Sequence, residues 1–217
     1  MSKRSTDTRS RILEATIAKL ESHGGAGVRM ADIAKATGVS RQAVYLHFST
    51  RSELLIAAAR HLDDKLDVDG RLAPSRHAAT GRERLKRYIE FWGRYVPDIY
   101  GVGKALLLAE ADDEAAREAW GDRMQALRDG CRAAIDALHG DGDLAPGWSR
   151  PGATDALWML LLVPNWEHLT QRCGWSTEQY IARMTMLAEA SFVMAPAENS
   201  AVDRARRRAP GRRHHAG

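Results

Sequence analysis

Residues 30–48 read MADIAKATGVSRQAVYLHF, and this stretch decides the fold of the N-terminal part of the chain. Its apolar residues predict a short helix over about 30–36 and a second helix that begins after Ser40, a favourable N-cap residue. Gly38 lies between the two, where a glycine adopts the left-handed conformation that ends a helix without the steric cost of a Cβ atom. Two short helices joined by a turn of about three or four residues form the plan of a helix-turn-helix.

The second of these helices is predicted to have one apolar side and one polar side. Ile33, Val39 and Val44 can fill the wedge between the helices, so the polar residues remain outside. Arg and Gln make paired hydrogen bonds to the edges of guanine and adenine, and Ser, Tyr and His suit phosphate oxygens. We interpret the outward face as a candidate DNA interface, although a solvated helix face would show the same pattern. The candidate contacts are Ser40, Arg41, Gln42, Tyr45 and His47.

Helical periodicity continues on both sides of this stretch, and no strand–turn–strand pattern interrupts it. We therefore predict an all-α protein with an N-terminal three-helix helix-turn-helix domain within residues 1–66. Residues 67–81 mix Gly, Pro and polar residues and are interpreted as a linker. A helical C-terminal domain is expected over 82–195. The basic tail at 196–217 has almost nothing to bury, so we expect it to be disordered.

Local signals predict where individual helices begin, end or bend. Pro97 is expected to end a helix that starts near residue 82, because proline lacks the backbone N–H and its ring clashes with the preceding turn. Pro164 is expected to bend a helix over about 154–172 for the same reason. Ser49 or Ser52 is expected to cap the helix that follows the helix-turn-helix.

Charge is distributed unevenly along the chain. Residues 1–65 carry 11 Lys and Arg against 7 Asp and Glu, residues 66–195 carry 15 against 19, and residues 196–217 carry 6 against 2. A basic head and tail can meet a polyanion, whereas the acidic middle has no such reason to. The basic arm of Lys3, Arg4, Arg9 and Arg11 is expected to attract phosphates.

Several classes of protein are disfavoured by what the sequence lacks. Two cysteines exclude a disulfide framework and a cysteine-rich zinc module. The sequence contains no HExxH, GxSxG, P-loop or GxGxxG motif, so we expect no catalytic site, cofactor or metal. No apolar run approaches the roughly 20 residues that span a bilayer and no signal peptide is apparent, so we expect a cytoplasmic protein without a membrane partner.

Aromatic residues are concentrated in the second segment of the chain, and all six Trp lie there. Pockets with apolar and aromatic walls and a few polar groups are where small molecules bind, so we predict a ligand pocket. The alternative is that these side chains only fill the core. The candidate lining residues are Trp92, Tyr95, Trp120, Met124, Trp158, Trp166 and His168.

The chain resembles the DNA-binding domain of the tetracycline-repressor (TetR) family over about residues 7–60. The resemblance rests on Asp32-Ile33-Ala34, Gly38-Val39-Ser40, Val44-Tyr45-Leu46-His47-Phe48 and Arg51-Ser52-Glu53-Leu54-Leu55. It implies a homodimeric transcriptional regulator, usually a repressor, in which the five candidate residues contact a palindromic DNA operator. Arg51 matches the family's usual Lys, a phosphate contact at a helix N-terminus. Arg29 stands where the family often has a capping Thr or Ser, so a phosphate contact is expected there instead.

The same resemblance implies a small-molecule effector and a dimer built from the last two long helices. The segment 156–163 is apolar on nearly all sides, which predicts burial on all sides. An apolar or aromatic ligand in the C-terminal domain would release the protein from its operator. A DNA-binding protein without a ligand remains the first alternative, and a helical enzyme the second. The expected seam on the last helix consists of Tyr180, Met184, Leu187, Ser191 and Met194.

Overall fold

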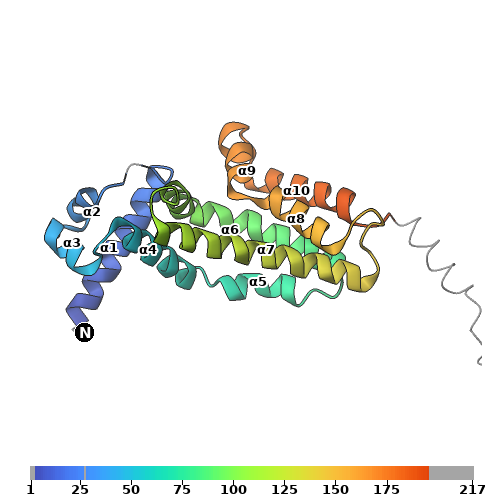
Figure 1. Cartoon of the computed structure of the whole chain (residues 1–217), viewed down its shortest axis with the longest axis horizontal. Coiled ribbons are helices and arrows are strands. Elements are labelled where there is room, and N and C mark those ends of the chain that lie inside the picture. Colours follow the sequence, from blue (N-terminus) through green and yellow to red (C-terminus); the bar gives the residue numbers. More distant parts are fainter. Residues whose placement is uncertain (1–2, 27, 196–217) are drawn as a thin grey trace, which may run out of the picture.

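The computed structural model describes residues 3–26 and 28–195 and consists of helices and the turns that join them. Within these ranges the β-type pairing is limited to an isolated bridge between Leu144 and Val193, so the prediction of an all-α protein is confirmed. Figure 1 shows an elongated molecule with a small helical head at one end and a longer helical body. The tail predicted over 196–217 lies outside the described residues.

The head is a compact group of helices around the helix-turn-helix. Its core consists of side chains that are completely buried, among them Ile12 and Leu20 of the first helix, Ile33, Val44 and Phe48. The first helix packs against the second and the fourth, which holds the two short helices in place. The head contains α1 (Lys3–Ser22), α2 (Met30–Thr37), α3 (Arg41–His47) and α4 (Arg51–Lys65).

The cap of α4 differs from the prediction. Thr50 is the N-cap, and its Oγ1 accepts a hydrogen bond from the backbone N–H of Glu53 at 3.0 Å. Ser49 donates to the Glu53 carboxylate instead, from its backbone N–H and from its hydroxyl, both at 2.7 Å. Ser52 is buried inside the first turn. Ser49 and Ser52 were the wrong choices because Ser and Thr both suit a cap, and the path of the backbone selects among the three residues.

The body is built on a long antiparallel pair of helices, α6 and α7 (Figure 1). In this view α5 lies along one side of the pair, and α8 and α10 lie along the other. The body contains α5 (Val68–Arg76), α6 (Gly81–Ala109), α7 (Glu114–Asp141), α8 (Arg150–Leu161), α9 (Val163–Glu167), the π-helix η1 (His168–Arg172) and α10 (Thr177–Phe192).

The segment interpreted as a linker contains a helix that the sequence analysis missed. Residues 67–81 include all of α5, which begins where Asp67 accepts the backbone N–H of Gly70 at 3.2 Å. Val68 and Leu72 pack against the core of the body. The Gly and Pro of this segment lower its helix propensity, but packing against α6 outweighs that preference.

The two prolines behave differently from each other. The helix expected to stop at Pro97 does not stop, because α6 runs through it as one element. Buried residues on both sides of the proline, including Val96 and Val102, hold the flanking turns in the core. The bend expected near Pro164 is confirmed, since the chain leaves helical geometry at Leu162 and Pro164 then falls in the first turn of α9.

The apolar stripe of α10 faces the chain's own core. Tyr180, Met184 and Met194 are buried within this chain, so their expected place in a seam between two copies is wrong. Leu187 and Ser191 are exposed. Helical spacing identified a stripe but could not say which neighbour covers it.

In the described part of the chain, every helix is too short or too polar to cross a membrane.

Candidate DNA interface and ligand cavity

The short helix α3 presents one face outward and one face inward. Val44 and Phe48 are completely buried against the rest of the head. Arg41, Gln42 and Tyr45 are exposed and His47 is partly buried, so the structure places the predicted contacts on or beside a single outward surface. An exposed helix of seven residues with its N-terminal turn at the surface can enter a DNA major groove.

The turn between α2 and α3 is held by its backbone. Gly38 has a left-handed φ of 69° and ends α2, which is why a residue without a Cβ atom is suited to this position. Ser40 caps α3, because its Oγ accepts the backbone N–H of Ala43 at 3.1 Å. A hydroxyl that accepts one hydrogen bond still carries its own proton, so Ser40 can also donate to a phosphate oxygen.

Arg29 and Arg51 are exposed at the starts of α2 and α4, the helices that precede and follow α3. Arg29 occupies the N-cap of α2, where its backbone N–H donates to Asp32 Oδ2 at 3.2 Å and its side chain does not cap the helix. The Nε of Arg51, at the first position of α4, donates to the carbonyl of Val28 at 3.3 Å. Each guanidinium has five N–H donors, so this contact positions Arg51 without using up its capacity for a phosphate.

Two arginines of the predicted basic arm, Arg9 and Arg11, also make contacts that hold the head together. Arg11 Nη2 donates to the carbonyl of Thr37 at 2.7 Å, which supplies a partner for the end of α2. The guanidinium of Arg9 lies over the ring of Phe48 at 4.9 Å. The side chains of Lys3 and Arg4 lie outside the described residues. The partners of Arg9 and Arg11 come from elements distant in the sequence, and each guanidinium keeps donors for a phosphate, so the expected attraction of phosphates stays a prediction.

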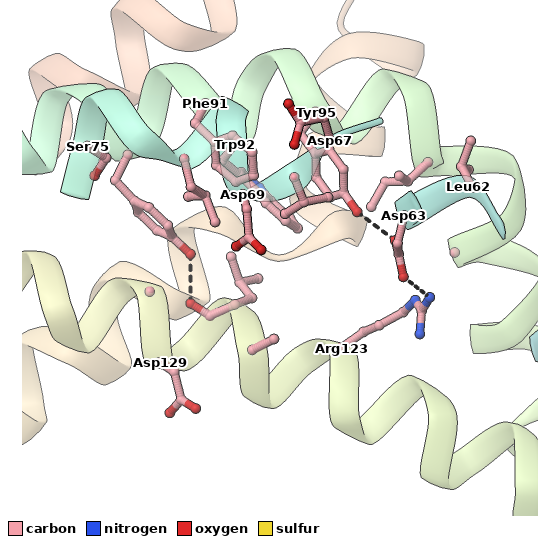
Figure 2. A pocket seen from close by; sticks show the side chains of 18 of the residues that line it. Leu62, Asp63, Asp67, Asp69, Ser75, Phe91, Trp92, Tyr95, Arg123 and Asp129 are labelled. Carbon is pink, nitrogen blue, oxygen red and sulfur yellow. Dashed lines mark hydrogen bonds and ion pairs between the residues drawn. The ribbon is translucent and has the colours of Figure 1, made fainter. Parts of the chain in front are cut away.

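The body contains a cavity of about 820 Å³ whose walls come from α4, α5, α6 and α7 (Figure 2). Trp92, Tyr95 and Trp120, three of the seven predicted lining residues, form part of its wall. Figure 2 shows α5 and α7 on opposite sides of the cavity, with the aromatic side chains of α6 between them. Its size is suited to a small organic ligand.

The other four predicted residues lie away from the cavity. The ring of Trp166 packs against Tyr100 at 5.1 Å, and Trp158 lies under the guanidinium of Arg128 at 5.8 Å. Met124 is half-buried on α7, and His168 is exposed at the start of η1. The prediction was wrong for Met124 because only one face of α7 borders the cavity. It was wrong for Trp158, Trp166 and His168 because α8, α9 and η1 supply no part of the cavity wall.

Several lining residues were not predicted. Tyr88 and Phe91 extend the aromatic wall along α6, and Leu72 and Ser75 come from α5. The spacing of Tyr88, Phe91, Trp92 and Tyr95 is that of one helix face, so this signal was available in the sequence. The contribution of α5 was not, because its segment lacks a clear helical pattern.

Asp63 of α4 connects three helices at one end of the cavity. Its carboxylate accepts the Tyr95 hydroxyl at 2.9 Å and pairs with Arg123 Nη2 at 2.6 Å (Figure 2). Burial, together with the neighbouring Asp63 carboxylate, raises the pKa of Tyr95 above its ordinary value. The phenol therefore stays protonated near neutral pH and keeps donating, so the head helix α4 is tied to both α6 and α7.

Carboxylates are prominent at the rim of the cavity. Asp64, Asp67 and Asp69 line it in addition to Asp63, whereas the carboxylate of Asp129 points away from the other lining side chains (Figure 2) and pairs with Arg132 at 3.0 Å. Asp69 pairs with Arg76 at 2.9 Å, and both groups are largely in solvent, so this pair is weak. The cavity thus combines an aromatic wall with more acidic than basic groups at its rim. Arg76, Arg84 and Arg123 are the basic lining residues.

The side of the body opposite α5 has an apolar surface. Met159 of α8 and Met186 and Leu187 of α10 are exposed large hydrophobic residues on the two helices that lie along this side (Figure 1).

In the described part of the chain, no group of three or more His, Cys, Asp or Glu side chains is placed to hold a metal ion.

Comparisons with known proteins agree with this architecture. The family described as "Bacterial regulatory proteins, tetR family" matches residues 12–58, from α1 into α4. The chain is similar to the HTH-type transcriptional regulator CymR of Pseudomonas putida, with 28% identity over 162 residues that cover 72% of this chain and 75% of that protein. It is also similar to the HTH-type transcriptional repressor SCO4008 of Streptomyces coelicolor, with 26% identity over 169 residues, or 73% of this chain and 77% of that one.

A solved structure shares the fold of the whole described chain. The crystal structure of a transcriptional regulator from Saccharomonospora viridis in complex with choline has a TM-score of 0.75 and 22% identity, and the alignment covers 88% of this chain and 100% of that one. The match of the head and the similarity to named regulators over most of the chain lead to one conclusion: this chain is a DNA-binding transcriptional regulator whose head matches the TetR family over residues 12–58.

Proposed function

We propose that this regulator is a homodimeric repressor that leaves a palindromic operator when a small ligand enters the cavity of the body. The observation that carries the proposal is the position of α4. Its N-terminal half packs in the head through Leu54 and Leu55, and its C-terminal half supplies Leu62 and Asp63 to the cavity wall. A ligand that prefers one position of α4 would therefore shift the position of the head, and differential affinity of this kind is what links two sites.

In this proposal residues 1–66 form the DNA-binding domain. Arg41 and Gln42 read base edges, and the other contacts of α3, with Arg29 and Arg51, hold phosphates. In a dimer the two copies of α3 would enter successive major grooves about 34–36 Å apart. The exposed apolar side chains of α8 and α10 support a dimer interface on that side of the body, away from the cavity. Residues 82–195, together with α5, form the ligand-binding and dimerisation domain.

The chemistry of the cavity favours a particular kind of ligand. Its aromatic wall favours an apolar or aromatic body, and its rim of carboxylates favours a positive charge over a negative one. The similar regulator from Saccharomonospora viridis was solved with choline, a small quaternary ammonium compound, which supports this class as a starting point. We further propose a cytoplasmic, non-catalytic role, because the partner of the head is DNA.

The proposal is tested with the full chain in three steps. Light scattering during gel filtration determines whether the protein is a dimer. In vitro selection from random duplex DNA then identifies an operator, which is expected to be an inverted repeat. Thermal shift and fluorescence anisotropy on that operator finally compare choline and benzyltrimethylammonium with 3,3-dimethyl-1-butanol, the neutral analogue of choline.

The expected result is that an organic cation raises the melting temperature and displaces the operator, while the neutral analogue needs a higher concentration. Asp69→Asn, at the rim of the cavity, should weaken the effect of the cation. Asp136→Asn, which also removes a carboxylate paired with an arginine but lies outside the cavity, is the matched control. DNA binding that no cationic, apolar or aromatic compound changes would favour a ligand-independent regulator. Turnover of a bound compound would favour an enzyme.

A further inference from the structure

Leu46 is an apolar side chain on the polar face of α3. Its relative exposure is 82%, against 57% for Met186, the next most exposed large hydrophobic residue in the described part of the chain. Its neighbours Val44 and Phe48 are completely buried and supply the core contacts of this helix. Leu46 therefore contributes almost nothing to the packing of the head, and its apolar surface is available to a partner.

The position of Leu46 puts this surface next to a base-reading residue. Leu46 lies one turn after Gln42, so the two share a face of α3, and side chains of a helix lean toward its N-terminus. Four residues of helix rise roughly 6 Å, which is less than two base-pair steps of about 3.4 Å each. A base that meets Leu46 lies within two steps of the base that meets Gln42.

The major groove offers a leucine one complementary group. Guanine, adenine and cytosine present hydrogen-bond donors and acceptors there, while thymine also presents its C5 methyl group. A leucine placed against a polar base edge would remove that edge from water without replacing its hydrogen bonds. A leucine placed against the thymine methyl buries apolar surface on both sides.

We infer that Leu46 is a specificity-determining residue that selects a thymine in each half of the operator by packing against its C5 methyl group. This inference rests on the proposed docking of α3 in the major groove. It adds an apolar contact to the polar residues of the interface. Leu46 thereby favours thymine at one position that the hydrogen-bonding side chains do not read.

The test replaces thymine by deoxyuridine, which removes the methyl group and leaves the base pair intact. Each thymine of the selected operator is substituted in turn, in both half-sites, and affinity is measured by anisotropy at one fixed salt concentration. The wild-type protein is expected to lose about fourfold in affinity per half-site at one thymine, the effect of returning one methyl-sized group to water. That thymine should lie within two steps of the base whose discrimination is lost in Gln42→Ala.

The same scan is then repeated with Leu46→Ala and with Leu108→Ala. Leu108 is an exposed leucine of α6 in the body and is the matched control. Leu46→Ala should bind thymine and uracil operators with nearly equal affinity and keep its melting temperature, whereas Leu108→Ala should discriminate between them as the wild type does.

Three results would overturn the inference, and they have different causes. A selection without any enriched sequence would remove the proposed docking together with it. An operator that binds normally with every thymine replaced would remove the role of Leu46 alone. A thymine preference that persists in Leu46→Ala would assign the methyl group to another residue.

Discussion

In the head, single residues have structural roles that few residue types can fill. In the body, one role, such as forming the cavity wall, is divided among many apolar side chains. Gly38 is left-handed, Ser40 caps α3, and Phe48 fills the space beneath it. In the body, a wall such as that of the cavity is formed by Tyr88, Phe91, Trp92 and others on one helix face. A functional motif can therefore be identified from sequence where the local backbone geometry limits which residue types fit. It is hard to identify where the only requirement is that the side chains together fill a volume.

The largest effect is expected from removing Phe48, the completely buried aromatic side chain at the centre of the head. Phe48→Ala should destabilise the head by about 3–5 kcal/mol, because a completely buried aromatic ring leaves a cavity. Operator binding should be lost while the helical signal and the proposed dimer of the body persist. Circular dichroism melts and gel filtration measure both. The control is Tyr45→Ala. Because Tyr45 is 44% exposed, this variant should change the free energy of unfolding by less than about 0.5 kcal/mol. Simultaneous unfolding of the body would show that the two regions are one cooperative unit.

A second change acts on the junction between the two regions. A Cβ atom at Gly101 of α6 would lie 2.7 Å from the backbone nitrogen of Glu21 in α1. Gly101→Ala should therefore push the head away from the body and cost about 1–3 kcal/mol of stability. The control is Gly121→Ala on α7, where a Cβ atom meets nothing within 4 Å. That variant should be more stable by up to about 1 kcal/mol, since alanine favours helix over glycine. Equal melting temperatures for the two variants would contradict this account of the junction.

Within the head, base readout and phosphate contact can be separated by two substitutions. Gln42→Ala should change preference at one operator position by about 1–3 kcal/mol. Arg51→Ala should weaken binding to all sequences alike and lower the salt slope by about one. Affinity across a panel of operator variants at several salt concentrations measures both effects. Gln42→Ala variants that lose affinity equally on every sequence would argue against base readout.

The smallest expected effect comes from the capping network of α4. The Ser49 hydroxyl and backbone N–H donate to Glu53, which lowers the pKa of that carboxyl from its ordinary value. A lowered pKa in the folded state means that this stabilisation is complete above the ordinary glutamate value of about 4.3 and is lost as the pH falls below it. Glu53→Gln should flatten the acid side of the stability curve slightly, and Glu118→Gln, an exposed residue of α7, should not. Acid melts that are identical for Glu53→Gln and the wild type would count against the network.

Much of the head was predictable, and the reason is local. The bond that caps α3 joins residues three apart in the sequence, so the pattern around Gly38 and Ser40 contains nearly all of the information. Its long-range braces were not predictable. Arg11 bonds to Thr37 across 26 positions, and no feature of the sequence near either residue indicates the pairing.

The body was predictable as a set of helices, but the cavity was predictable only in part. Trp92, Tyr95 and Trp120 were identified because bulky aromatic residues on amphipathic helices are natural wall residues. Trp158 and Trp166 are also bulky aromatic residues on helices, but they pack against Arg128 and Tyr100 and do not line the cavity. Helix α5 and the continuity of α6 through Pro97 were missed because packing outweighed the preference of glycine and proline against helix.

The sequence by itself determined the all-α class, the helix-turn-helix and its outward residues, because caps, turns and helical periodicity depend on neighbours along the chain. Tertiary structure alone decided which apolar stripe faces the core, which aromatic residues surround the cavity, and that Asp63 joins α4 to Tyr95 and Arg123. Those outcomes depend on how helices far apart in the sequence pack together. A helix has several faces, and only its neighbours in space determine what each face meets.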